Sequence, residues 1–270
     1  LGTNSIISSG SVINNGILLG SVGTMEFNST CRAQTIEGND FEIGDLIINY
    51  TGSQSVDLTN TLDVINLLIL QNGVLKINAG SLTLKSNTTN TAMVDEVLTG
   101  TVLGEVTVER YIPAKRAFRF MSSAVNTTTP INDHWQEGVN NTSLTMNVNS
   151  NPGYGTHITG SSTGSNGFDA TGTGNPSIFR YDNLNQLWED LSDTDATLLN
   201  AGDAYRLFVR GSRALDLSSN ASVADPTVLR ATGSLVTGPF INSDLGSSAG
   251  AFNLIGNPYQ ASVDMNATLG

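Results

Sequence analysis

Oxygen-bearing side chains gather in one short segment of this sequence. Asp190, Asp193 and Asp195 follow Trp188 closely, and Asp203 lies a little further along the chain. Carboxylate oxygens on a flexible loop are the ligands that Ca²⁺ prefers. The spacing does not match an EF-hand, which needs a glycine and a distal glutamate. Two interpretations therefore stay open: a calcium site formed by Asp190, Asp193 and Asp195, or an acidic loop that is simply solvated.

Histidine chemistry is restricted to two positions, His134 and His157. A Ser-His-Asp triad or a zinc site would need one of them, and neither stands at metal-ligand spacing from other donors. Two G-x-S-x-G segments, at 160–164 and 246–250, lack the strand and helix that must flank a nucleophile elbow. We therefore predict no catalytic residue and expect His157 to lie in a strand or a loop.

Aromatic side chains offer a second kind of chemistry, because an exposed ring can stack on the C–H face of a sugar. The irregular segment 126–176 is long enough to be a functional loop, and it holds Trp135, Tyr154 and His157, our candidate binding residues. The alternative is that Trp135 and Phe168 fill the core. Further candidates for a stacking platform are Tyr181, Trp188 and Tyr259.

Charge excludes two classes of partner. The chain has 12 Lys+Arg against 24 Asp+Glu, a net charge of −12, so its field repels nucleic acid and anionic membrane surfaces. The longest apolar run, Val64–Leu70, contains Asn66 and is too short to insert into a membrane. Cys31 is the single cysteine, so we expect no internal disulfide and a buried thiol.

Residues 1–98 show the pattern of a parallel β-helix or related solenoid. Strand-length apolar bursts alternate with Gly, Asn and Ser, and Ile47, Ile65 and Leu82 repeat at roughly one solenoid coil of ~20 residues. Asparagines stand near the expected corners. Stacking such coils buries side chains that one coil alone cannot bury. The asparagines are Asn49, Asn66, Asn72 and Asn78.

Residues 99–270 show a different pattern, that of a β-sandwich-like (jelly-roll-like) module, giving an all-β chain of two domains. We expect a hairpin between strands 106–112 and 117–121, in which Arg110 or Arg119 pairs with Glu109 or another carboxylate across the strands. The alternative is that these cations contact an anionic glycan. A short helix is expected at 131–137, capped by Asn132 or Asp133. Further strands are expected at 177–181, 186–189, 204–209, 227–231 and 251–255.

Three segments resemble a module of large secreted proteins of Bacteroidota. They are Val106–Ser123, Gly155–Gly160 and Asn253–Tyr259. The family often has Trp where Phe118 and Phe252 stand. Such proteins are cargo of the type IX secretion system, and in them the module commonly follows solenoid-like repeats.

The resemblance implies export by the type IX secretion machinery, a secreted or cell-surface location, and a role in adhesion or gliding motility. It supplies no catalytic residues. Because the chain begins at Leu1 rather than Met, we expect a processed product or a fragment. Our first hypothesis is a non-catalytic adhesin or spacer that binds a surface glycan or another surface protein. The alternative is a polysaccharide lyase or hydrolase built on a β-helix, for which the scattered solenoid acids are the candidates.

Overall fold

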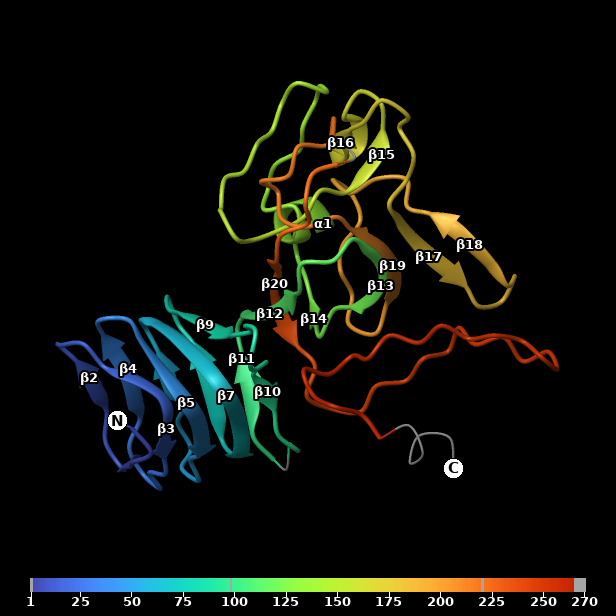
Figure 1. The fold of residues 1–270 in the computed structure, drawn as a ribbon. Coiled ribbons are helices and arrows are strands. Elements are labelled where there is room, and N and C mark those ends of the chain that lie inside the picture. The colour runs from blue at the N-terminus through green and yellow to red at the C-terminus, as the bar shows by residue number, and fades with distance from the viewer. Residues whose placement is uncertain (1, 98, 220, 265–270) are drawn as a thin grey trace. The chain divides into compact units, whose positions relative to one another are not determined.

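The structure is a computed structural model that describes residues 2–97, 99–219 and 221–264 (Figure 1). The chain is nearly all β, with 3% helix and 41% strand. It divides into two compact units, each described by itself below. The first comprises Leu1–Glu109, Thr232–Gly238 and Tyr259–Gly270, and the second comprises Arg110–Ala231 and Pro239–Pro258.

The first unit contains a β-solenoid of about five turns, as the sequence predicts. Two parallel sheets run along it. The first sheet contains β1 (Ser5–Ser8), β3 (Leu19–Phe27), β5 (Phe41–Asn49), β7 (Thr61–Asn72), β9 (Ser81–Leu84) and β12 (Val106–Ile112), with β10 (Met93–Val94) beside β7. The second contains β2 (Val12–Asn14), β4 (Gln34–Gly38), β6 (Val56–Leu58), β8 (Val74–Ile77) and β11 (Thr101–Leu103).

The solenoid core consists of stacked rows of apolar side chains, one from each coil. Leu46 of β5 pairs with Met25 of β3 and Leu68 of β7, and all three are fully buried. Each strand contributes at alternate positions, so the polar residues between them face outward. Stacking also supplies every inner strand with a neighbour on both sides, which satisfies the backbone hydrogen bonds that an isolated coil would leave unpaired.

Side chains at the coil corners form hydrogen-bonded ladders that run across the coils. Asn49 Nδ2 donates to Glu26 Oε1 at 3.2 Å, Asn72 Nδ2 donates to Asn49 Oδ1 at 2.8 Å, and Thr99 Oγ1 donates to Asn72 Oδ1 at 2.9 Å. Each amide therefore bonds to the equivalent position of the preceding coil. A second series of this kind runs through Thr24, Asp45, Asn66 and Asn90.

Glu109 of β12 lies inside the first unit rather than on its surface. Its side chain is buried and accepts from Lys85 Nζ at 2.8 Å. The expected pairing of Glu109 with Arg110 or Arg119 is therefore wrong. Arg119 donates instead to the carbonyl oxygens of Pro113 and Lys115, at 3.4 and 3.2 Å. The unit that contains the solenoid runs to Glu109, past the expected boundary at residue 98.

The second unit contains a four-stranded antiparallel sheet in the order β13-β19-β17-β18. Its strands are β13 (Ala117–Ser122), β19 (Ala204–Val209), β17 (Ile178–Asp182) and β18 (Leu187–Asp190). The other elements are β14 (Val125–Asn126), α1 (Ile131–Trp135), β15 (Thr159–Ser161), the 3-10 turn η1 (Ser165–Gly167) and β16 (Asp169–Ala170). β12 runs from the first unit into this one, and β20 (Thr227–Leu235) begins in this unit and ends in the first.

Several local expectations for this region are wrong. β13 pairs with β19, with Ala117 opposite Val209, and does not form a hairpin with the strand before it. The helix α1 begins after Pro130, without a side-chain cap from Asn132 or Asp133. The segment 251–255 is not a strand. Its backbone bonds instead to the β17–β18 turn, since Leu254 N donates to Asn183 Oδ1 at 2.8 Å.

Three more observations concern the sequence expectations. The β-sandwich is not confirmed. Cys31 is exposed rather than buried, so burial does not shield its thiol. Within the described ranges, no helix combines the length and the apolar character needed to cross a membrane.

Candidate functional site

The four-stranded sheet of the second unit has one buried face. Tyr205, Leu207 and Val209 of β19 and Ile178 of β17 are essentially inaccessible to solvent. Trp135 of α1 packs its ring edge-on against Tyr205, with ring centroids 5.5 Å apart. This inner face anchors the sheet on a core, so the opposite face is held rigidly in place.

The outer face of the same sheet carries aromatic side chains at alternate strand positions. The cross-strand register places Phe118 opposite Phe208 and Tyr181 opposite Trp188. Arg206 of β19 is opposite Phe120 of β13 on one side and opposite Phe179 of β17 on the other. We call this set the aromatic face: Phe118, Phe120, Phe179, Tyr181, Trp188, Arg206 and Phe208.

The aromatic face is open to solvent. The exposed fractions are 52% for Phe118, 66% for Phe120 and 37% for Trp188. Phe120 and Trp188 have ring centroids 6.3 Å apart and planes that differ by only 17°. Exposing large rings side by side costs hydration free energy that burial would recover, so such a patch is typical of a binding surface.

Arg206 lies at the centre of the aromatic face. Its guanidinium carbon is 4.1 Å from the ring centroid of Trp188, 4.6 Å from that of Phe179 and 5.0 Å from that of Phe118. These are cation–π distances. Within the part of the chain that the structure describes, the Nε of Arg206 is buried and has no hydrogen-bond acceptor.

A polar cleft of about 450 Å³ in this unit is lined in part by Tyr181 of the aromatic face. Arg180 and Asp203 line it, and they form an ion pair at 3.2 Å. Arg180 also donates to the hydroxyl oxygen of Tyr205 at 2.7 Å. Burial of Tyr205 raises the pKa of its phenol to about 12, so the hydroxyl stays protonated at neutral pH. Phe240 lines the same cleft, with an exposed fraction of 37%.

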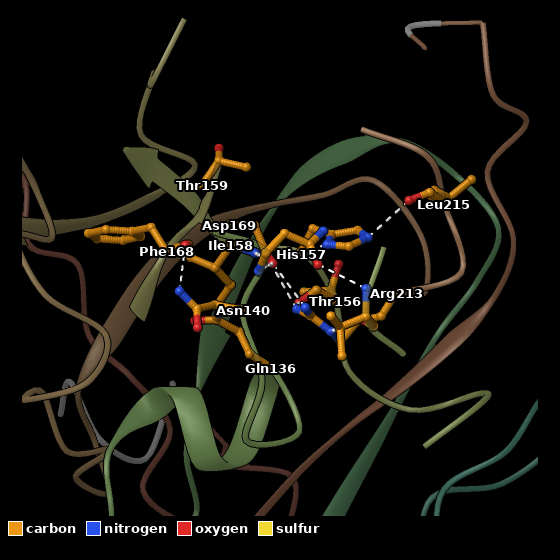
Figure 2. Close-up of polar contacts among 12 residues, drawn as sticks. Gln136, Asn140, Thr156, His157, Ile158, Thr159, Phe168, Asp169, Arg213 and Leu215 are labelled. Carbon is orange, nitrogen blue, oxygen red and sulfur yellow. Dashed lines mark hydrogen bonds and ion pairs between the residues drawn. The ribbon is translucent and has the colours of Figure 1, made fainter. Parts of the chain in front are cut away.

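His157 lies in a buried polar cluster, which Figure 2 shows together with the segments around it. Its Nε2 donates to the carbonyl oxygen of Leu215 at 3.0 Å, and its Nδ1 is 3.2 Å from Asp169 Oδ2. Arg213 holds the same carboxylate through two bonds of 2.9 Å. His157, Asp169 and Arg213 are all fully buried. His157 therefore has no exposed atom with which to touch a ligand.

The Asp169 carboxylate is the centre of this cluster. Besides Arg213 it accepts from two backbone amides, Asn141 N at 2.7 Å and Ile158 N at 3.1 Å. Burial alone raises the pKa of Asp169. The neighbouring His157 and Arg213 outweigh that effect and hold the pKa of Asp169 below its ordinary value. Four separate segments of the unit are thus joined at one anionic group.

The other candidate binding residues of the long segment lie apart from the aromatic face. Trp135 is buried with Tyr205, and Phe168 is buried as well, as the packing alternative expects. Tyr154 is half-buried, and the guanidinium carbon of Arg230 lies 4.3 Å from its ring centroid. The structure does not bring Trp135, Tyr154 and His157 together into one exposed surface.

The three candidate calcium ligands are divided between a strand and a loop. Asp190 ends β18 opposite Phe179, whereas Asp193 and Asp195 follow it in the loop. Asp193 Oδ1 accepts from the backbone amides of Asp195 and Ala196, at 2.7 and 2.9 Å. Partial burial and the nearby Asp193 and Asp133 raise the pKa of Asp195. Among residues 2–97, 99–219 and 221–264, no group of three or more His, Cys, Asp or Glu side chains is arranged to hold a metal ion.

Sequence reasoning named Tyr181 and Trp188 as stacking candidates but missed Phe120, Phe179 and Phe208. A signal was present, because aromatic residues alternate with other residues in the segments 118–120 and 179–181. That period of two places the rings of each strand on one face. What the sequence alone could not supply was the pairing order of β13, β19, β17 and β18.

No family model, no curated protein and no solved structure matches this chain.

Proposed function

We propose that this chain is a non-catalytic binding and spacer segment of a large secreted, cell-surface protein. In this proposal the solenoid is the spacer, and the second unit binds a glycan or a surface protein. A stack of about five turns supports the spacer role, because each coil is fixed to the next by backbone and side-chain hydrogen bonds.

The observation that carries the binding role is the aromatic face. A sheet that buries one side and exposes several rings on the other has an unpartnered apolar surface on a rigid support. Ligand-binding sites are commonly built from such rings together with a few polar groups. The aromatic face has this composition, since Arg206 supplies polar hydrogens among the rings.

Location and export are proposed on the sequence resemblance alone. The segments Val106–Ser123, Gly155–Gly160 and Asn253–Tyr259 support export by the type IX secretion machinery and display at the cell surface. A role in adhesion or gliding motility follows from that location. We also propose that residues 99–270 contain a β-sandwich-like module, supported by the four-stranded antiparallel sheet with one buried face.

The test of the proposed function is binding without turnover. The 270-residue chain is applied to an array of glycans, and the same glycans are assayed for newly released reducing ends or unsaturated products. We expect binding to at least one class of glycan and no product. Turnover of a polysaccharide would overturn the non-catalytic proposal, and absence of binding to every glycan would overturn the glycan-binding role.

A second experiment tests location. Antibodies raised against the chain are applied to intact cells that produce the full-length protein. Labelling of intact cells, lost in a strain without a working type IX secretion system, is the expected result. Labelling that appears only after permeabilisation would contradict surface display.

A further inference from the structure

We propose that the aromatic face binds an uncharged polysaccharide chain, with Trp188 and Phe120 stacking on sugar rings and Arg206 donating hydrogen bonds to their hydroxyl groups. This inference rests on the proposed glycan-binding function and goes further, because it names the site, the class of glycan and the residues that contact it.

The side chains of the aromatic face suit a sugar chain. The residues directed to this side of the four strands are rings, the Arg206 guanidinium and small or polar residues. A second guanidinium, that of Arg210, lies 4.9 Å from the ring centroid of Phe208. A pyranose needs flat rings for its C–H face and donors for its hydroxyl groups, and the aromatic face carries both.

The two most suitable rings lie close together. Phe120 and Trp188 are on opposite edges of the sheet, β13 and β18, yet their centroids are 6.3 Å apart and their planes differ by 17°. Both rings are exposed. Neighbouring rings of similar orientation let successive sugar units of one chain rest on the same surface, so the geometry fits a polysaccharide better than a single sugar.

Arg206 provides the polar contact. Its guanidinium is held by three rings at 4.1 to 5.0 Å, which fixes its plane before any ligand arrives. Its Nε is buried without an acceptor among the described residues, so the donors for a ligand are the terminal Nη groups of this half-buried side chain. A preoriented donor costs little conformational entropy on binding. Sugar hydroxyl oxygens can accept from these Nη groups.

The charge around the face favours an uncharged glycan. Asp190 lies on the same side of the sheet as Arg206 and two strands away from it, because both residues are opposite Phe179. The whole chain has a net charge of −12. An acidic polysaccharide would therefore approach a chain of its own sign, and the two cations at the face, Arg206 and Arg210, are already in contact with its rings.

Affinity electrophoresis through gels that contain a soluble polysaccharide tests the proposal. The neutral arm uses mixed-linkage β-glucan, xyloglucan and galactomannan, and the acidic arm uses alginate and polygalacturonate. We expect retardation by at least one neutral polysaccharide that persists in 0.5 M salt, and none by the acidic arm. The salt step separates stacking from charge attraction, which screening weakens.

Variants locate the site. Trp188→Ala and Phe120→Ala should each weaken binding about tenfold or more, a loss of about 1.4 kcal/mol. Arg206→Lys keeps the charge but loses the planar donors, and should weaken binding by a similar factor. The matched control is Phe240→Ala, whose ring has the same exposed fraction as Trp188, 37%, but lines the cleft instead. Melting curves of every variant establish that the fold is retained.

Tryptophan fluorescence gives an independent readout. Trp135 and Trp188 are the only tryptophans in the sequence, and Trp135 is buried whereas Trp188 is exposed. Binding at the aromatic face should protect Trp188 from acrylamide quenching. The variant Trp188→Phe keeps a ring at this position, so it should still bind while losing the protection signal.

Each outcome has a defined meaning. Neutral-glycan binding that Trp188→Ala, Phe120→Ala and Arg206→Lys leave unchanged would overturn the site while leaving the proposed function standing. Binding of acidic polysaccharides alone, or self-association abolished by Phe120→Ala, would overturn the assignment of an uncharged polysaccharide as the ligand. The proposed function would again be left standing. Failure to bind any glycan in either arm, or on the array, would remove the proposed glycan-binding role and this inference together.

Discussion

Arg213 and Asp169 form a two-bonded ion pair in which both side chains are fully buried, with each Nη 2.9 Å from a carboxylate oxygen. The pair joins residues that are 44 positions apart in the chain. Arg213 also donates to the carbonyl oxygens of Val148 and Thr156. The ion pair therefore ties the long irregular segment to the segment that follows β19.

Removing the charge of Asp169 should strongly destabilise the second unit. Asp169→Asn leaves the Arg213 guanidinium buried without its counter-charge, which costs about 3–5 kcal/mol in comparable buried pairs. Urea unfolding followed by circular dichroism measures this loss. The control is Glu189→Gln, which removes a carboxylate from an exposed position on β18 and should change stability by less than about 0.5 kcal/mol. Equal effects of the two substitutions would contradict the structural role of the pair.

The Asp169 carboxylate should also make the stability of the second unit depend on pH. The pKa of Asp169 is lowered in the folded protein, whereas an unfolded aspartate has a pKa of about 3.9. A lowered folded pKa means that the ionised carboxylate contributes stability above about pH 4 and that this contribution is lost as the pH falls through the folded pKa. We expect the stability difference between the wild type and Asp169→Asn to stay constant from pH 7 to about pH 5. It should shrink below about pH 4, and a difference that grows on acidification would contradict this explanation.

The aromatic residues of the long segment should behave as core residues. Trp135→Ala removes a buried ring that packs on Tyr205 and should cost about 3–5 kcal/mol. Tyr154→Ala should cost less, because Tyr154 is only half-buried. Thermal unfolding compares the two. A Trp135→Ala protein with unchanged melting temperature and reduced glycan binding would contradict this prediction. It would instead favour segment 126–176 as a recognition loop with Trp135 as one of its binding residues.

Calcium should leave the melting temperature of the chain unchanged. The Asp193 carboxylate already caps two backbone amides of its own loop, and Asp190 stands on the sheet rather than in that loop. Differential scanning fluorimetry in 5 mM CaCl₂ and in 5 mM EGTA measures the effect. A rise in calcium that chelation reverses, and that Asp193→Asn abolishes, would show that Asp190, Asp193 and Asp195 close around an ion.

The solenoid could be predicted because its information is local and repeated. Apolar bursts recur at roughly coil spacing, and asparagines such as Asn49 and Asn72 mark the corners. The residue-level repeat of Ile47, Ile65 and Leu82 is wrong, because Ile47 pairs with Ile69 and Leu82 pairs with Leu62. Each coil meets only its neighbours, so periodicity along the sequence maps directly onto contacts. The unit that contains the solenoid extends past residue 98 for the same reason, because β11 and the beginning of β12 add further coils although their sequence looks like the next module.

The second unit was harder to predict because its contacts join distant segments. β13 pairs with β19 rather than with the strand nearest to it in sequence, and no local pattern specifies that choice. His157 was identified as noteworthy, yet its burial depends on Asp169 and Arg213, which no motif connects to it. Individual stacking residues such as Trp188 could be named, whereas the surface they form with Phe120 required the sheet order.

The hydrogen-bonded ladders of the solenoid make its length adjustable in fixed increments. Phe41 of β5 pairs with Leu62 of β7, so residues 41–61 constitute one interchangeable unit of the stack. Its removal or duplication would shorten or lengthen the solenoid by about 4.8 Å, the spacing between neighbouring strands. Asn49 or its equivalent would still find a partner in the coil before it. A protein built in this way can tune its reach by gene-level insertion or loss of single coils, without redesigning any contact.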